Sequence, residues 1–421
     1  MPVNSIFSEE RLYNYVNDLC FPRLAGTESE EKAVKITIDK FSKIGFTKDE
    51  INREPFQFSN FYSTLLIRLI SMINLIFLLT IVLLIYIQLY ASLLIFSGLF
   101  IITLLIIRAL KNPESPKIWG KYYGQMFNAT NVYVKIPGKE INNKKMGDII
   151  ISAHLDTKSQ SFKTKWRIVI YRIWFFNGII LIIFYFLFLL MAFGNIKINI
   201  RLLEIGIWSP TIIISIMNLL LISLNTHNKS PGALDNATGM AIVFELSSYF
   251  LKNPLNSYNL WFCQFSAEEL GTMGSRVFLN THEREINKYK IFQINLDMIS
   301  CKNHRHNRIE YRKSYGLFPR KIIAPVLNNY FEQNAKENQI KIHGFHLTTG
   351  AHTDTIPFHL RDYEAIDIVT RAAAMWSHTK KDTIDKIDSK VLKDGCILAK
   401  NVILNLDTHV SIKKKHYSDN N

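Results

Sequence analysis

The chain has 421 residues and a formal net charge of +15 at pH 7, from 50 Lys and Arg against 35 Asp and Glu. This length suits one large domain or two and is ample to bury a core. The positive charge would suit a nucleic-acid-binding protein, but that class needs a basic face with groups that stack on or read bases. Much of the excess lies instead beside long apolar segments, which argues for a membrane protein and against a nucleic-acid partner.

The first long apolar segment, Leu69 to Ile107, contains no charged residue. As one helix it would be roughly 58 Å long, whereas the hydrocarbon core of a bilayer is about 30 Å thick. We therefore predict two membrane spans that turn near Gln88 to Ser92. The preceding residues, 8–58, have helically spaced apolar positions and are expected to belong to the soluble part of the chain.

A second apolar pair follows at Ile173–Phe193 and Ile205–Leu224, separated by the polar piece 194–201. The first member is rich in Phe, Ile and Leu and is typical of a membrane span. The second is interrupted by Pro210 and Asn218. A partly interfacial or packed helix is therefore an alternative there, although membrane helices tolerate proline.

Basic residues gather at the same end of both pairs, and the distal turn of the second pair carries only Lys197 and Arg201, with Glu204 beside them. This positive-inside bias predicts a multi-pass integral membrane protein whose soluble part lies on the cytoplasmic face. The flanking residues are Arg68, Arg108, Lys111, Lys117 and Lys121 for the first pair, and Lys158, Lys163, Lys165, Arg167, Arg172 and Lys229 for the second.

The remaining sequence alternates between strand and helix patterns. Strand-like runs occupy residues 131–136, 148–153, 260–265, 291–296 and 365–369, and a helical apolar pattern begins at Met240. Such alternation predicts an α/β fold with a mostly parallel mixed sheet covered by helices. In these sheets, ligand-binding residues collect just beyond the carboxyl ends of the strands. The four scattered cysteines predict free thiols rather than a disulfide framework.

Polar side chains of metal-ligand type follow the predicted strands. One by one, each has an ordinary explanation as a helix cap, a hydrogen-bonded core residue or a solvated edge. Together they form an oxygen and nitrogen ligand set that suits zinc and related divalent ions. The set consists of His154, Glu268, Glu269, Asp297 and His378 after strands, with Asp235 on the small-residue turn 230–239.

The positions of these residues suggest a separate role for each: metal ligand, bridging ligand, general base or orienting residue. Two metals about 3.5–4 Å apart can share one bridging carboxylate and a bridging water, and Asp235 on its crowded turn suits the bridge. One of the adjacent Glu268 and Glu269 can bind metal while the other acts as general base. Asp156, two residues after His154, is expected to accept the second ring N–H of that imidazole.

Five motifs occur in order: His154–Asp156, Gly232–Gly239, Glu268–Ser275, Asn295–Met298, and His378 with Asp382–Thr383. They are accompanied by Pro22–Thr27 and Thr353–Phe358. In this order they resemble metallopeptidase family twenty-eight, which includes zinc aminopeptidases, glutamate carboxypeptidases, glutaminyl cyclases and a metal-free receptor ectodomain. The resemblance covers the chain apart from the apolar pairs and implies the α/β fold of the zinc exopeptidases.

Position by position, the resemblance implies a site with two Zn²⁺ ions, for which Co²⁺ or Mn²⁺ are alternative ions. His154 and Asp297 would hold one ion, Glu269 and His378 the other, and Asp235 would bridge them. Glu268 would be the general base. Because all of the ligands are present, a metal-free relative of receptor type is the weaker expectation.

The resemblance also implies a peptide substrate, and the apolar pairs imply a lipid bilayer as the second partner. The predicted function is that of a membrane-anchored di-zinc aminopeptidase. A glutaminyl cyclase or carboxypeptidase on the same scaffold, or a membrane scaffold without catalysis, are the alternatives. We expect a peptidase domain at residues 1–60, 111–166 and 226–412, transmembrane hairpins at 61–110 and 167–225, and a polar tail at 413–421.

Overall fold

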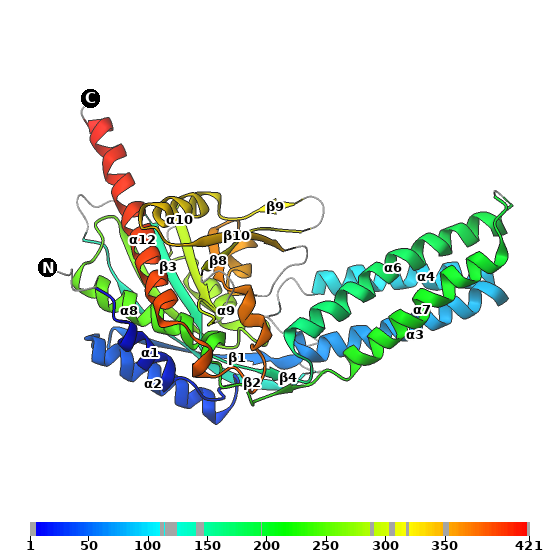
Figure 1. Cartoon of the computed structure of the whole chain (residues 1–421), viewed down its shortest axis with the longest axis horizontal. Helices are drawn as coiled ribbons and strands as arrows, with labels where there is room; N and C mark the ends of the chain where they lie inside the picture. The colour runs from blue at the N-terminus through cyan, green and yellow to red at the C-terminus, as the bar shows by residue number, and fades with distance from the viewer. Residues whose placement is uncertain are drawn as a thin grey trace. The chain divides into compact units, whose positions relative to one another are not determined.

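Figure 1 shows the computed structural model, which describes residues 6–109, 113, 124–139, 147–194, 196–286, 290–302, 308–316, 320–347 and 353–418. The chain divides into two compact units. The α/β unit comprises Met1–Phe58, Met126–Ser159 and His227–Asn421, and the helical unit comprises Ser59–Gln125 and Gln160–Thr226. The flanking residues Lys111, Lys117 and Lys121 lie outside the described residues.

The α/β unit is built on one sheet, in which nine strands are described. Their order is β1-β2-β6-β3-β7-β11-β8-β10, with β9 paired to β8. Neighbours β6, β3, β7 and β11 run parallel, whereas β2 is antiparallel to β6 and β8 to β11. The strands are β1 Ile51–Ser59, β2 Met126–Ile136, β3 Gly147–His154, β6 Tyr258–Phe265, β7 Ile291–Asp297, β8 Ile309–Tyr315, β9 Lys321–Ile322, β10 Ile342–Leu347 and β11 Glu364–Val369.

Helices cover both faces of this sheet, as Figure 1 shows. On one face α8 packs on β3, β6 and β7, and α1, α2 and α12 pack on α8. The opposite face carries α9 and α11. The predicted fold class, a mostly parallel mixed sheet covered by helices, is confirmed. The helices are α1 Glu9–Asp18, α2 Glu28–Ile44, α8 Thr238–Lys252, α9 Met273–His282, α10 Pro325–Glu337, α11 Ile356–His359 and α12 Ser389–Ser418.

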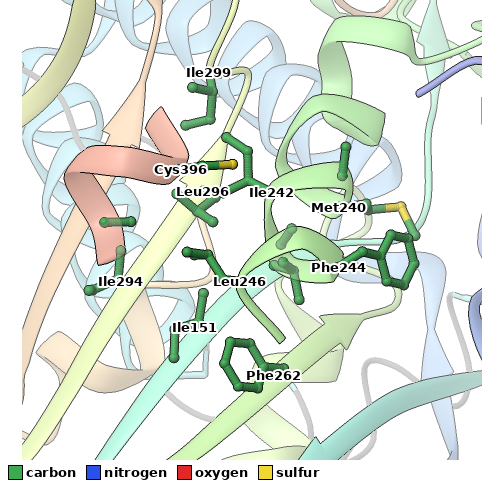
Figure 2. Close-up of a cluster of buried hydrophobic side chains, with 14 of the residues drawn as sticks. Ile151, Met240, Ile242, Phe244, Leu246, Phe262, Ile294, Leu296, Ile299 and Cys396 are labelled. Atoms are coloured by element: carbon green, nitrogen blue, oxygen red, sulfur yellow. The ribbon is translucent and has the colours of Figure 1, made fainter. Parts of the chain in front are cut away.

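Strand β3 explains how the sheet separates two apolar cores. Successive side chains of a strand point to opposite faces. Ile149 and Ile151 join the core under α8, and Ile150 joins the core under α9. Figure 2 shows the first core, where Ile151 and Phe262 of the sheet face Ile242 and Leu246 of α8. Because the central strands are buried on both faces, they read in the sequence as continuous apolar runs.

The helical unit consists of long apolar helices around a small core. Helices α3 Thr64–Ile87, α4 Leu89–Ala109, α6 Thr164–Ala192 and α7 Ile200–Ile222 are each long and apolar enough to cross a membrane. The break between α3 and α4 falls at Gln88, within the predicted turn, and α6 begins at Thr164, ahead of its predicted start. Helix α7 continues through Pro210 and packs on both α3 and α6.

The polar residues of α7 have partners inside the helical unit. Asn218, which interrupts the apolar pattern, is buried. It accepts a hydrogen bond from Trp174 Nε1 at 3.1 Å and donates one to Asn74 Oδ1 at 2.8 Å. The amide therefore links three helices, because Asn74 lies on α3 and Trp174 on α6. A polar side chain satisfied in this way is compatible with an apolar environment.

Candidate metal centre

The candidate ligands converge because the parallel strands end together. His154 ends β3 and pairs with Phe265, the last residue of β6. Asp297 ends β7 and pairs with Val369, the last residue of β11. The carboxyl ends of parallel neighbours meet at one edge of the sheet, where binding residues of such folds collect. Glu268 and Glu269 follow β6, and His378 follows β11 after the short helix η3 Arg371–Met375.

The first of two ligand groups contains His154, Asp235 and Asp297, all buried. Nε2 of His154 lies 3.1 Å from Oδ1 of Asp235 and 3.6 Å from Oδ1 of Asp297. Burial opposes a charged imidazole, but the neighbouring carboxylates of Asp156, Asp235 and Asp297 outweigh it and raise the pKa of His154 well above its usual value. A divalent ion bound here would also place positive charge among these carboxylates.

The second group contains Asp235, Glu269 and His378. Nε2 of His378 lies 3.3 Å from Oδ2 of Asp235 and 3.0 Å from Oε2 of Glu269. Asp235 thus directs one carboxylate oxygen at each group. Glu268, although buried beside Glu269, belongs to neither group.

The turn that carries Asp235 is held from two sides. The carboxylate of Asp382 accepts the backbone N–H groups of Leu234 at 2.7 Å and Asp235 at 3.1 Å. Asn236 donates to the backbone oxygen of Leu296 at 2.8 Å, which ties the turn to the end of β7. A Cβ atom at Gly239 would lie 2.1 Å from that same oxygen, so only glycine permits this approach. Asp235 itself precedes α8.

Arg23 explains the role of the early turn Pro22–Thr27. Its buried guanidinium donates to the backbone oxygens of Leu155, Pro231 and Gly232 at 2.6, 2.8 and 3.0 Å. It therefore joins the segment after His154 to the turn that carries Asp235. Burial lowers the pKa of Arg23 to about 10, while Asp382 opposes this shift.

Asp156 contacts the second ring nitrogen of His154 through its backbone oxygen. Nδ1 of His154 lies 3.0 Å from the backbone oxygen of Asp156 and 3.7 Å from its carboxylate oxygen Oδ1. The carboxylate instead accepts the backbone N–H groups of Glu268 at 3.0 Å and Glu269 at 3.2 Å. The imidazole is thus oriented by a main-chain carbonyl, and the Asp156 side chain holds the loop of the two glutamates.

Strained backbone occurs next to the ligands. Ala267, Met298 and His378 have φ angles of 55°, 49° and 59°, in the left-handed region that non-glycine residues rarely adopt. Ala267 precedes Glu268, Met298 follows Asp297, and His378 is itself a candidate ligand. Such strain persists only where the surrounding structure over-determines it, and it concentrates at functional sites.

Several carboxyl groups are buried close together at this site and have raised pKa values. Burial raises the pKa of Glu268 well above its usual value; His154 opposes this, and the charges of Glu269 and Asp354 add to it. Burial likewise raises the pKa of Asp297 to about 6 and that of Asp354 to about 7. Crowded carboxylates of this kind favour the binding of cations.

The residues present fit divalent metal ions. Two buried ligand atoms, Oδ1 of Asp297 and Oε1 of Glu269, have no hydrogen-bond partner, and buried polar atoms are otherwise almost always satisfied. The donor set is imidazole nitrogen and carboxylate oxygen, which suits zinc. Both the orphan oxygens and the donor chemistry agree with a metal centre.

Two residues of this metal site, Lys158 and Asp354, are not predicted in the sequence analysis. Lys158, grouped there with the membrane-flanking charges, is buried, and its Nζ lies 2.9 Å from Oε2 of Glu269. It also donates to the backbone oxygen of Glu269 at 2.8 Å. Asp354 is buried, and its charge affects Glu268. The available signals were the position of Lys158 four residues after His154 and the motif Thr353–Phe358.

A family model described as peptidase family M28 matches residues 222–401. Over this segment the chain is therefore similar to peptidase family M28. The resemblance to metallopeptidase family twenty-eight is thereby confirmed. The matched segment contains Asp235, Glu268, Glu269, Asp297 and His378, whereas His154 precedes it.

One known aminopeptidase is similar to part of the chain. Aminopeptidase YwaD of Bacillus subtilis (strain 168) is 28% identical over 175 residues, which are 39% of this chain and 36% of that relative. The chain thus matches about a third of the length of that relative.

Solved structures share the fold over nearly the whole chain. An aminopeptidase from Aneurinibacillus sp. strain AM-1 has a TM-score of 0.54 at 14% identity, covering 94% of this chain and 93% of that one. A glutaminyl cyclase from an Acidobacteriales bacterium has a TM-score of 0.54 at 16% sequence identity, and the match covers 96% of each chain. BSAP, a zinc aminopeptidase from Bacillus subtilis, has a TM-score of 0.54 at 12% sequence identity, and the match covers 95% of each chain.

Proposed function

We propose that the chain is a membrane-anchored metallo-aminopeptidase that binds two zinc ions and removes N-terminal residues from peptides. The observation that carries this proposal is the pair of buried ligand groups that share Asp235. The family match supports a peptidase. The relative named aminopeptidase YwaD and the structure titled a zinc aminopeptidase support an exopeptidase that acts at the amino end.

The ligands divide between the two ions. His154 and Asp297 would hold one zinc, Glu269 and His378 the other, and the two oxygens of Asp235 would serve both. When bound, zinc supplies an activated water and a Lewis acid for the peptide carbonyl. Asp156, Asp382 and Arg23 would keep the ligand-bearing segments in place through their backbone contacts.

Glu268 would move the proton. It lies next to a ligand yet in neither ligand group, and burial among negative charges raises its pKa well above the usual value. A carboxylate with a raised pKa is a good proton acceptor near neutral pH. Glu268 would take a proton from the attacking water and deliver it to the amine nitrogen as the C–N bond breaks.

The helical unit would anchor the enzyme in a bilayer. Each inserted hairpin of two spans would return the chain to the side that it left, and the second hairpin must do so for His154 and Asp235 to meet. The distribution of Lys and Arg supports a peptidase domain on the cytoplasmic face.

Labelling of cysteines introduced near Lys163 and near Lys197 tests the orientation, because a membrane-impermeant reagent applied to the cytoplasmic side should reach only the Lys163 side. Labelling of Lys197-side positions would reverse the assignment.

The activity is tested with the full-length protein purified in detergent. We expect about two zinc ions per chain and cleavage of aminoacyl-anilides, because two ligand sets are present. N-acetylated anilides serve as the matched control and should not be cleaved, since an aminopeptidase requires a free amine.

Other outcomes would replace the proposal. Cyclisation of N-terminal glutaminyl peptides without anilide cleavage would identify a glutaminyl cyclase. Release of C-terminal residues would identify a carboxypeptidase. Protein without bound zinc and without hydrolysis would be a membrane scaffold.

A further inference from the structure

The two ligand groups differ in one respect: the ammonium group of Lys158 contacts a ligand carboxylate of the second group. In the second group, Oε2 of Glu269 faces both Nε2 of His378, at 3.0 Å, and the ammonium of Lys158, at 2.9 Å. In the first group, the described ion pairs of Asp297 are with His154 alone. One ligand carboxylate is therefore shared with a fixed positive charge, and its counterpart is not.

The position of Lys158 is fixed by its neighbours. The backbone N–H of Thr157 donates to the oxygen of Arg23 at 3.1 Å, and Oγ of Ser159 donates to the oxygen of His227 at 2.8 Å. The Lys158 side chain is buried, and its ammonium contacts both the side chain and the backbone oxygen of Glu269. It cannot turn to solvent without giving up both contacts.

We propose that Lys158 lowers the affinity of the group Asp235, Glu269 and His378 for its metal, so that the two ions load in sequence. This inference rests on the proposed two-metal function. The first ion enters the group of His154, Asp235 and Asp297, and the second enters the Lys158 side at a higher free-metal concentration. Occupancy of the second position, and with it activity, then follows the supply of metal.

The physical reason is a competition for one carboxylate. Without metal, Glu269 and Lys158 form a buried ion pair at full strength. With metal, the same carboxylate shares its charge with a divalent cation, and the ammonium repels that cation across a medium of low dielectric constant. Lys158 therefore stabilises the metal-free state more than the loaded state. Lys158 also orients Glu269, but this effect saves at most the conformational entropy of one side chain, which is smaller than the repulsion between two buried cations at this range.

The test is zinc titration of full-length Lys158→Met in competition with a chromophoric chelator. For the wild type we expect two dissociation constants separated by about tenfold or more. In Lys158→Met, the weaker should tighten by about tenfold or more, while the tighter changes less than about threefold. The side chain of methionine keeps the length and apolar volume of the lysine stem but carries no charge.

Two control variants isolate the charge. Lys158→Arg keeps a cation beside Glu269 and should titrate like the wild type. Lys229→Met removes an exposed cation from the neighbouring segment and should also leave both constants unchanged. A second constant that is unchanged or weaker in Lys158→Met would overturn the proposal.

A second pair of variants keeps the test valid if Lys158→Met does not fold. Asp297→Ala leaves only the Lys158 side intact, and Glu269→Ala leaves only the other. We expect the single zinc of Asp297→Ala to bind more weakly than that of Glu269→Ala, and the reverse order would contradict the inference. A wild type that binds no zinc would refute the proposed function itself, whereas two zinc ions with Lys158-independent affinities would refute this inference alone.

Discussion

The two units of the chain place apolar side chains in opposite ways. In the α/β unit the apolar residues of the central strands and of α8 are buried. In the helical unit many large apolar side chains face outward, with Ile87, Tyr90 and Leu94 exposed by 74, 77 and 75%. Soluble monomeric proteins rarely expose an apolar surface of that extent. The two units therefore differ in where their apolar side chains lie, and the helices of the helical unit are long and apolar enough to cross a membrane.

Buried polar groups make the same distinction. The α/β unit buries a cluster of carboxylates and imidazoles at the end of its sheet. Among the described residues of the helical unit, the buried polar side chains are uncharged, such as Asn218 and Ser92. Because the cost of burying a charge is met only by a partner or a metal, the charged chemistry belongs to the α/β unit.

The largest expected effect follows replacement of Asp235 by Ala. This change removes the carboxylate common to both ligand groups, so zinc content should fall towards zero and turnover by about 10⁴-fold or more. Metal analysis and an aminoacyl-anilide assay measure the two effects. Asp39→Ala, at an exposed position on α2, is the control. Retention of both zinc ions would show that Asp235 does not hold the metals, and it would remove the evidence that the buried charges of the α/β unit form a metal site.

Replacement of Glu268 by Gln should separate metal binding from proton transfer. Zinc content is expected to stay at the wild-type level, because Glu268 lies in neither ligand group. Turnover should fall by about 10²–10⁴-fold, the usual contribution of a general base. Glu337→Gln, on the exposed face of α10, controls for the loss of one charge. Unchanged turnover would remove Glu268 from the mechanism.

Acid should destabilise the α/β unit through Glu310. Burial raises the pKa of this carboxyl, but hydrogen bonds to Arg371 and Arg308 outweigh it and lower the pKa from 4.5 to about 2. A lowered pKa in the folded state gives stability that is present above about pH 4.5 and is lost as the pH falls towards 2. Because Arg371 is half exposed, we expect about 1–3 kcal/mol, below the full value of the shift.

Hydrogen exchange resolved by segment measures this effect in each unit. Between pH 4.5 and 2, protection after correction for intrinsic rates should fall around β8 and η3 more than in α3, α4, α6 and α7. In Glu310→Gln, β8 should already be less protected at pH 7, and its pH dependence should be smaller. Equal loss of protection in both units would contradict the assignment to Glu310.

The smallest expected effect concerns the helical unit. Asn218→Leu removes the amide that joins Trp174 and Asn74 and should destabilise the helix packing by about 0.6–1.7 kcal/mol, the range for hydrogen bonds between membrane helices. Unfolding in mixed micelles measures it. Asn177→Leu is the matched control, because the described hydrogen bond of its amide goes to the oxygen of Ile173 on its own helix. A larger loss in the control would show that the link through Asn218 is not what holds these helices.

Much of the architecture follows from local pattern. A charge-free stretch longer than a bilayer must turn, and the chain does so at Gln88. The apolar runs that predict strands coincide with β2, β3, β6, β7 and β11. Strands β1, β8 and β10 have no such signal, because Ile51–Ser59 and Ile309–Tyr315 mix charged with apolar residues.

The site divides in the same way between sequence and tertiary structure. The sequence by itself determined which side chains follow strands and that Asp235, His154, Glu269, Asp297 and His378 are of metal-ligand type. Those are local facts, since a residue after a parallel strand reaches the sheet edge whatever the rest of the chain does.

Only the tertiary structure decided which groups support those ligands. The Asp156 carboxylate bonds the amide of Glu268, 112 residues away, instead of the ring two residues before it. Lys158 pairs with Glu269 instead of flanking a membrane span. The physical reason is that the partner of a buried charge is chosen by proximity in space, after the strands have been ordered. The spacing of residues along the chain therefore does not predict a contact between residues that are far apart in the sequence.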